Sequence, residues 1–164
     1  METDRGGQQA REALQKAYEA HRLPLLRLAT LLVTEGQTAE DLVQDVFVRS
    51  ASAVGALRED EVGPYLRRGV VNAWKNEVRH RRTVALAELK LVRGRGHQGT
   101  SLEDRDEIWM AIRRLPPRQR ACLVLRYYED LPDREVARLL GCRVGTVRSQ
   151  SSRAIEKLRK VISP

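Results

Sequence analysis

Residues 131–158, LPDREVARLLGCRVGTVRSQSSRAIEKL, decide the fold of this chain, because they have the pattern of two helices joined by a tight turn. Asp133 follows Pro132 and is predicted to cap the first helix, since its carboxylate can accept hydrogen bonds from the free N–H groups of the first turn. Gly141 stands where the chain must reverse, a position that commonly requires positive φ. A second helix is predicted from about residue 144 to 160. The stretch therefore predicts a helix-turn-helix.

The second of these helices is predicted to be basic on its outer side. Apolar or small residues recur at helical spacing and would face inward. The opposite positions hold Arg148, Ser149, Ser152 and Arg153. Arginine can form paired hydrogen bonds with guanine in the major groove, and serine can bond bases or phosphates. The alternative is an ordinary helical hairpin with a solvated basic surface. The small Ala137, Gly141 and the basic second helix coincide at one spacing, which favours DNA binding.

Charge is spread unevenly along the 164 residues, whose net charge is +8. Residues 1–61 carry 7 basic and 11 acidic side chains, whereas residues 62–82 carry 6 basic and 1 acidic. Residues 103–164 carry 14 basic and 9 acidic side chains. An acidic front with a basic middle and end predicts different partners for different parts, and nucleic acid for the basic parts.

Several classes of protein are disfavoured. Cys122 and Cys142 form no CxxC or Cys/His cluster, and the three histidines are scattered, so no metal site is expected. No carboxylate cluster or nucleophile–base pair emerges, so neither an enzyme nor a cofactor site is expected. The N-terminus lacks a signal pattern and no apolar run approaches a membrane span, which predicts a cytoplasmic protein without membrane insertion.

The front of the chain predicts three helices. The first covers residues 8–33, and Pro24 should bend or split it because it removes a hydrogen bond. The second, residues 38–56, opens with a capping box at Thr38 and has acidic side chains opposite its apolar stripe. Taken alone, those acids fit a solvated face better than a docking surface. After a polar loop at 58–63, a third, basic helix is predicted over 64–82. Trp74 is expected in the core, and the arginines of this helix are expected to contact phosphates.

The rest of the chain before residue 131 predicts a linker and two helices. Residues 83–102 contain a glycine-rich polar run and read as an interdomain linker. Helices are expected over 103–115 and 118–129, the latter with Tyr128 packed inward. The predicted architecture is all-α.

Three segments together resemble a known family. They are AEDLVQDVFVR at 39–49, PYLRRGVVNAWKNEVRHRR at 64–82, and LPPRQRACLVLRYYEDLPDREVARLLGCRVGTVRSQSSRAIEKLR at 115–159. They resemble the extracytoplasmic-function sigma factors, group IV of the sigma-70 family, in a sigma-E-like actinobacterial branch. The resemblance implies two small helical domains joined by a flexible linker. Sigma domain 2 would cover 8–82, the linker 83–102, and sigma domain 4, a winged-helix-like helix-turn-helix, 103–162.

The same resemblance implies roles for particular positions. The minus-thirty-five reader would use Arg143, Thr146, Arg148, Ser149, Ser152 and Arg153. The minus-ten element would be read and melted by Arg67, Arg68, Asn72, Lys75, Asn76 and Arg79. The docking helix would offer Asp41, Gln44, Asp45 and Phe47, which revises the solvated-face interpretation. Where the family often has an apolar residue, this chain has Ser151, near the inner face of the last helix.

The implied partners are promoter DNA and the RNA polymerase core, through the clamp helices of the largest subunit and the flap of the second-largest. An anti-sigma factor is a further possible partner. For the free protein the sequence leaves two arrangements open: an extended one, and a closed one in which the domains pack together and hide DNA surfaces. Two other functions compete with that of a promoter-specificity subunit. One is a self-sufficient regulator that binds an operator without polymerase, with the front half as a ligand or dimer domain. The other is an enzyme acting on nucleic acid, for which no residue set argues.

Overall fold

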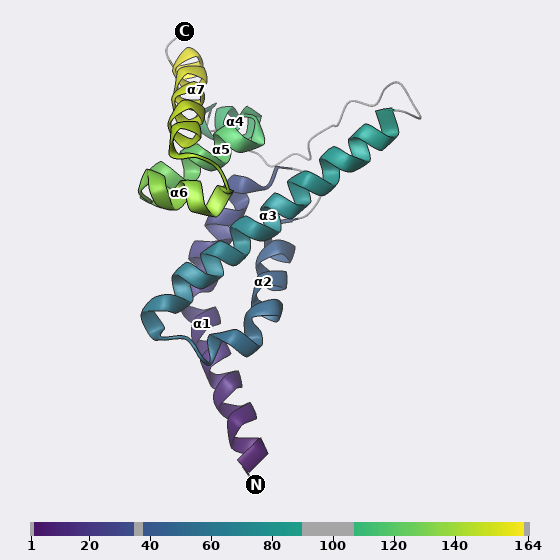
Figure 1. The fold of residues 1–164 in the computed structure, drawn as a ribbon, viewed down its shortest axis with the longest axis vertical. Coiled ribbons are helices and arrows are strands. Elements are labelled where there is room, and N and C mark those ends of the chain that lie inside the picture. The colour runs from purple at the N-terminus through teal and green to yellow at the C-terminus, as the bar shows by residue number, and fades with distance from the viewer. Residues whose placement is uncertain (1, 35–37, 90–106, 163–164) are drawn as a thin grey trace.

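The structure is a computed structural model that describes residues 2–34, 38–89 and 107–162. The described part of the chain is helical throughout, without a strand, as expected from the sequence (Figure 1). Its elements are α1 (Glu2–Leu32), α2 (Ala39–Val54), α3 (Glu59–Leu89), α4 (Glu107–Arg114), α5 (Pro117–Leu123), the π-helical turn η1 (Val124–Tyr128), α6 (Asp133–Leu140) and α7 (Val144–Ile162). Helices α1 to α3 form the front half, and α4 to α7 form the back half.

The front half is a three-helix unit around a core of large aliphatic side chains. Leu28, Leu32, Leu42 and Leu66 are almost completely buried. Helix α1 is not split at Pro24, which lies inside it. The proline still removes one backbone hydrogen bond. Burial of the aliphatic side chains on both sides of Pro24 offsets this loss, so a single helix persists.

Helix α3 is longer at both ends than the sequence indicated. The loop expected at 58–63 is wrong from residue 59 onward, because Glu61 Oε2 accepts a hydrogen bond from the Arg58 N–H at 3.0 Å and starts the helix early. At the other end the helix continues to Leu89. Residues 83–89, expected as linker, are therefore helical, and the remaining linker residues 90–102 lie outside the described residues. Thr83 Oγ1 donates to the Arg79 carbonyl at 3.1 Å, within this helical extension.

The back half contains a wide turn that changes the register of one helix. In η1 the Glu129 N–H donates to the Val124 carbonyl at 3.0 Å, a bond across five residues. A π-turn adds one residue to a helical turn and so rotates the side chains around it. Tyr128, expected to pack inward, is instead 49% exposed.

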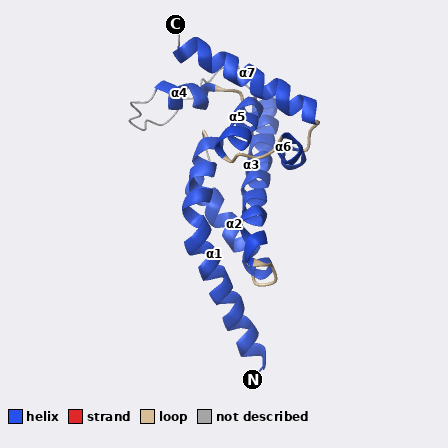
Figure 2. Cartoon of the chain, turned by 90° about the vertical axis from the view of Figure 1, so that its left-hand side faces the viewer, coloured by secondary structure: helices blue, strands red, loops and turns tan. Residues whose placement is uncertain are grey.

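The two halves pack against each other. Figures 1 and 2 show α6 lying against α3, and α5 and η1 contact α1. Arg120 of α5 is only 2% exposed and donates to the Leu32 carbonyl of α1 at 2.9 Å. It also donates to the carbonyls of Arg113 and Leu115 at 3.1 and 3.0 Å. One guanidinium thus joins the C-terminal end of α1, where the helix dipole favours a cation, to the end of α4.

Candidate nucleic-acid interface

Helices α6 and α7 form the helix-turn-helix that residues 131–158 predict. Gly141 ends α6 in the left-handed conformation, with φ 66° and ψ 44°, which glycine adopts without steric cost. The Cys142 N–H then donates to the Ala137 carbonyl at 3.0 Å, which satisfies an end of α6. The predicted cap is wrong by one residue: Pro132 occupies the N-cap position without a side-chain hydrogen bond, and Asp133 is the first residue of the helix. The carboxylate of Asp133 binds other groups instead.

The outer side of α7 is open to solvent. Val147 and Ala154 are fully buried on its inner side, together with Ser151. Ser151 Oγ finds no hydrogen-bond partner among the described residues, so a polar atom stands where an apolar side chain would pack. Of the six residues expected on the reader surface, Thr146 is half-buried. The exposed ones are Arg143, Arg148, Ser149, Ser152 and Arg153. Ser149 Oγ donates to the Thr146 carbonyl at 3.0 Å.

A carboxylate holds the central arginine of this surface. Arg148 Nε lies 2.8 Å from Asp133 Oδ2, and Arg126 Nε lies 2.7 Å from Asp133 Oδ1. We call these three residues the Asp133 bridge; it connects η1, α6 and α7. The hydrogen bond from Arg148 is the main cause that lowers the pKa of Asp133 below its ordinary value. Burial opposes this shift, and the positive charges of Arg126 and Arg148 add to it. The bridge therefore stays ionised at neutral pH.

The residues expected to read and melt the minus-ten element fall into two groups: some are exposed to solvent, and others contact the back half. Arg67 Nε pairs with Glu129 Oε2 at 2.6 Å, and Lys75 Nζ donates to the Leu139 carbonyl at 2.9 Å. Both contacts connect α3 to the back half, and both basic side chains are half-buried. The exposed members are Arg68, Asn72, Asn76 and Arg79. The packing thus occupies part of the α3 surface and leaves the α7 surface open.

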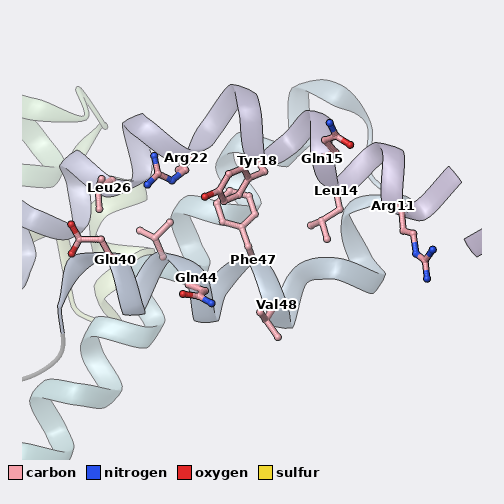
Figure 3. A pocket seen from close by; sticks show the side chains of 11 residues that line it. Arg11, Leu14, Gln15, Tyr18, Arg22, Leu26, Glu40, Gln44, Phe47 and Val48 are labelled. Carbon is pink, nitrogen blue, oxygen red and sulfur yellow. The ribbon is translucent and has the colours of Figure 1, made fainter. Parts of the chain in front are cut away.

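A groove between α1 and α2 contains two of the expected docking residues. It has a volume of about 560 Å³, and Figure 3 shows Phe47 of α2 pointing toward Tyr18 of α1. Gln44 and Val48 of α2 and Arg22 of α1 also line the groove. Phe47 is buried, not exposed, because its ring packs edge-on against the ring of Tyr18 with centroids 5.0 Å apart. Gln44 is exposed on the rim.

The other two docking candidates lie away from this groove. Asp41 is exposed in the first turn of α2, where its N–H donates to Thr38 Oγ1 at 3.2 Å, as the capping box predicts. Asp45 is exposed and lines a second cavity, between α2 and α3, with Asn76. Asp41, Gln44 and Asp45 therefore share the exposed side of one helix, with Phe47 supporting it from below.

Sequence reasoning missed Arg120 and Glu129, which hold the two halves together. Each is one of many charged residues in a helical pattern, and each finds its partner on a distant element. For Arg120 the sequence did contain a signal. It stands next to Ala121 and Cys122, which the apolar pattern places inside, and a buried charge without a partner is costly, so a partner for Arg120 could have been expected.

Two further features of the described residues bear on the class of protein. No group of three or more His, Cys, Asp or Glu residues there could hold a metal ion. None of the helices in that part of the chain combines the length and apolar character that crossing a membrane requires.

Comparison with known proteins gives the family. The model of sigma-70 region 2 matches residues 17–84, and that of sigma-70 region 4 matches residues 105–158. The chain is 30% identical over 153 residues to the ECF RNA polymerase sigma factor SigM of Mycobacterium tuberculosis, covering 93% of this chain and 78% of that protein. It is 32% identical over 177 residues to the RNA polymerase sigma-H factor of Pseudomonas aeruginosa, covering 98% and 90%.

A solved structure supports the same fold. It is that of the sigma factor RpoE in complex with the anti-sigma factor NepR from Bartonella quintana, with a TM-score of 0.66 at 21% identity, covering 93% of this chain and 95% of that one. Its helical architecture agrees with the two family regions found in the sequence. The chain belongs to the extracytoplasmic-function sigma factors of the sigma-70 family, the non-catalytic subunits that direct RNA polymerase to begin transcription at promoters.

Proposed function

We propose that this sigma factor reads the minus-thirty-five element through α7 and the minus-ten element through α3 while both halves are bound to the RNA polymerase core. The observation that carries the proposal is the solvent-exposed, basic outer side of α7 on a helix-turn-helix whose inner side is fully buried. Such a helix fits the major groove of B-DNA, where its side chains reach base edges.

Reading by α7 would divide its side chains into two roles. Arg148 lies in the middle of the exposed surface and is the candidate for a paired contact with guanine. Serine and arginine side chains around it are suited to phosphates, which fix the register of the helix but carry no sequence information. Arg143, immediately before α7, is placed for such a phosphate contact.

Reading by α3 would require a rearrangement. Arg68, Asn72, Asn76 and Arg79 are exposed and could contact an unpaired strand, since amides bond base edges and arginines bond phosphates. Arg67 and Lys75 are engaged by Glu129 and by the Leu139 carbonyl. For these two to reach DNA, the halves must separate. Capture of an extruded base would then offset part of the unstacking free energy, a few kcal/mol.

Binding to polymerase is assigned to the exposed side of α2, with Asp41, Gln44 and Asp45, beside the groove of Figure 3. The partner would be the clamp helices of the largest subunit, and the back half would bind the flap of the second-largest. Polymerase would hold the halves apart at the spacing of the two promoter elements. An anti-sigma factor is a further proposed partner, since the structurally similar RpoE is found in complex with one.

The direct test is transcription in vitro with purified core polymerase and this protein. Promoter-dependent transcripts are expected only when both are present, and sequencing their 5′ ends would reveal the promoter. Absence of such transcripts would overturn the proposal. A footprint on duplex DNA without polymerase would instead favour a self-sufficient regulator.

Arg148→Ala tests the assignment of α7. We expect it to weaken promoter binding by the holoenzyme about 10-fold or more, because one good paired base contact contributes about 1–3 kcal/mol of discrimination. Binding to random DNA should change much less. Arg159→Ala, at an exposed position in the last turn of the same helix, is the matched control. Equal losses on promoter and random DNA would reduce Arg148 to a phosphate contact.

A further inference from the structure

The Asp133 bridge has a geometry that concerns recognition more than folding. Asp133 is largely covered, with 18% of its side chain exposed, whereas the Arg148 side chain is 70% exposed. An ion pair with so exposed an arginine contributes little to stability. The acidic residue nevertheless lies at the first position of α6 and contacts the arginine at the centre of the proposed reader surface. The contact therefore calls for an explanation other than stability.

The contact with Asp133 uses only Nε of Arg148 and leaves the two terminal nitrogens of the guanidinium out of it. Asp133 Oδ2 accepts from Arg148 Nε, the inner nitrogen of the guanidinium. A paired contact with guanine O6 and N7 can be made with the two terminal nitrogens. A carboxylate on Nε restricts rotation of the planar group about its stem. Arg126, on the other carboxylate oxygen, fixes the carboxylate in turn.

The same carboxylate has an electrostatic effect of the opposite kind. DNA attracts proteins mainly through phosphate charges, and this attraction does not depend on sequence. A negative charge 2.8 Å from Arg148 offsets part of the attraction between that arginine and any nearby phosphate. Without the carboxylate, the long side chain could turn freely toward the backbone of any sequence.

We propose that Asp133 is a positioning residue that sharpens base selection by Arg148 and lowers the affinity of α7 for DNA of arbitrary sequence. The inference rests on the proposed function, because it takes Arg148 to contact a base of the minus-thirty-five element. The inference adds to the proposed function a residue, Asp133, that touches no base. It predicts that loss of the Asp133 carboxylate raises affinity for DNA of arbitrary sequence and lowers base selectivity.

The test uses the holoenzyme and a promoter library with a randomised minus-thirty-five element, whose transcripts are counted by sequencing. The Arg148→Ala protein identifies the base pair that this arginine selects, as the position where preference is lost. In the Asp133→Asn protein we expect preference at that position to fall about 3- to 10-fold while preference at the other positions is unchanged. Its affinity for random duplex DNA should rise about 2- to 3-fold at low salt.

Glu135→Gln is the matched control. It removes one negative charge from the same first turn of α6, outside the bridge. It should raise affinity for random DNA by a similar factor but leave base preference intact. The double variant Asp133→Asn/Arg148→Ala should show the same preferences as Arg148→Ala alone, since a positioning residue has nothing left to position.

The outcomes separate this inference from the proposed function. If Arg148→Ala loses preference at one base pair and Asp133→Asn keeps it, the positioning role is wrong and the reader role stands. If Arg148→Ala loses preference nowhere, the assignment of Arg148 as a reader fails, and the inference fails with it. Equal loss at all positions in Asp133→Asn would mean a structural role only and would also overturn the inference. Arg126→Gln, which frees the other carboxylate oxygen, should weaken preference at the same base pair and serves if Asp133→Asn fails to fold.

Discussion

Replacing Arg120 by methionine should uncouple the two halves of the protein. The side chain reaches three carbonyls, those of Leu32, Arg113 and Leu115, at 2.9 to 3.1 Å, and only 2% of the residue is exposed. Methionine keeps most of the length of the apolar stem but donates no hydrogen bond. The three carbonyls would lose a charged donor at a place that is closed to most of the solvent.

The expected loss in the free energy of unfolding is about 4–5 kcal/mol, for three charged hydrogen bonds. Hydrogen bonds from a charged group contribute about 1.5–3 kcal/mol each, and the low end applies here because water can enter between the halves after the change. The total stability of a protein of this kind is about 5–15 kcal/mol, so the variant should be severely destabilised. Arg120→Lys keeps the charge but lacks the planar fork, and should lose about half as much.

Urea denaturation followed by circular dichroism measures this loss. Arg118→Met is the control, because Arg118 lies in the same helix but is exposed, and its replacement should change stability by less than about 0.5 kcal/mol. We also expect the single transition of the wild type to separate into two in Arg120→Met, as each half unfolds by itself. A loss below about 1 kcal/mol with one cooperative transition would refute the reasoning.

Three further predictions concern packing, pH and thiol reactivity. Gly69→Ala would place a methyl group 2.8 Å from Val46 Cγ1 and should cost about 1–2 kcal/mol net of the gain in helix propensity, to be measured by thermal unfolding. Adding Val46→Ala to Gly69→Ala should restore part of the lost stability. Gly145→Ala is the control, because its new methyl group meets no atom within 4 Å and should cost no stability. An unchanged melting temperature in Gly69→Ala would contradict the close approach of α2 and α3. Because the pKa of Asp133 is lowered in the folded protein, the small contribution of the bridge to stability is fully present above the ordinary carboxyl pKa near 4. The small stability difference from Asp133→Asn should therefore shrink further as pH falls from 5 to 2 in urea titrations. Burial raises the pKa of Cys122 to about 11, so a thiol reagent at pH 8 should label the half-buried Cys142 first. Rapid labelling of both cysteines in the folded protein would be inconsistent with the burial of Cys122.

The helix-turn-helix could be predicted because its signals are local. Gly141 needs the left-handed conformation whatever the rest of the chain does, and the alternation of buried and exposed residues along α7 follows from helical spacing alone. Trp74 was also placed correctly in the core, at 4% exposure, because its neighbours at helical spacing are apolar. The matches to sigma-70 regions 2 and 4 confirm the family that the sequence resembles, while the roles that the resemblance implies for single residues stay predictions.

Element ends and long-range polar contacts could not be predicted in the same way. The glycine-rich run after residue 92 suggested a linker, but residues 83–89 have good helix formers and extend α3. Phe47 was assigned to the docking surface although it belongs to the apolar stripe of α2, and it is buried against Tyr18. The partners of Arg67, Arg120 and Asp133 depend on how helices meet in space, which spacing along one helix does not determine.

The wide turn η1 determines the direction in which the side chains after it point around the helix axis. Its five residues, Val124–Tyr128, carry the extra residue of a π-turn immediately before Glu129, which reaches Arg67, and Arg126 within it reaches Asp133. Deleting a single residue here would tighten the turn to an ordinary α-helical one and swing later side chains by about 100° around the axis. A one-codon deletion in this segment would therefore break the contact between the halves and the contact of Arg126 with Asp133 in a single event, while leaving every residue proposed to contact DNA in the sequence.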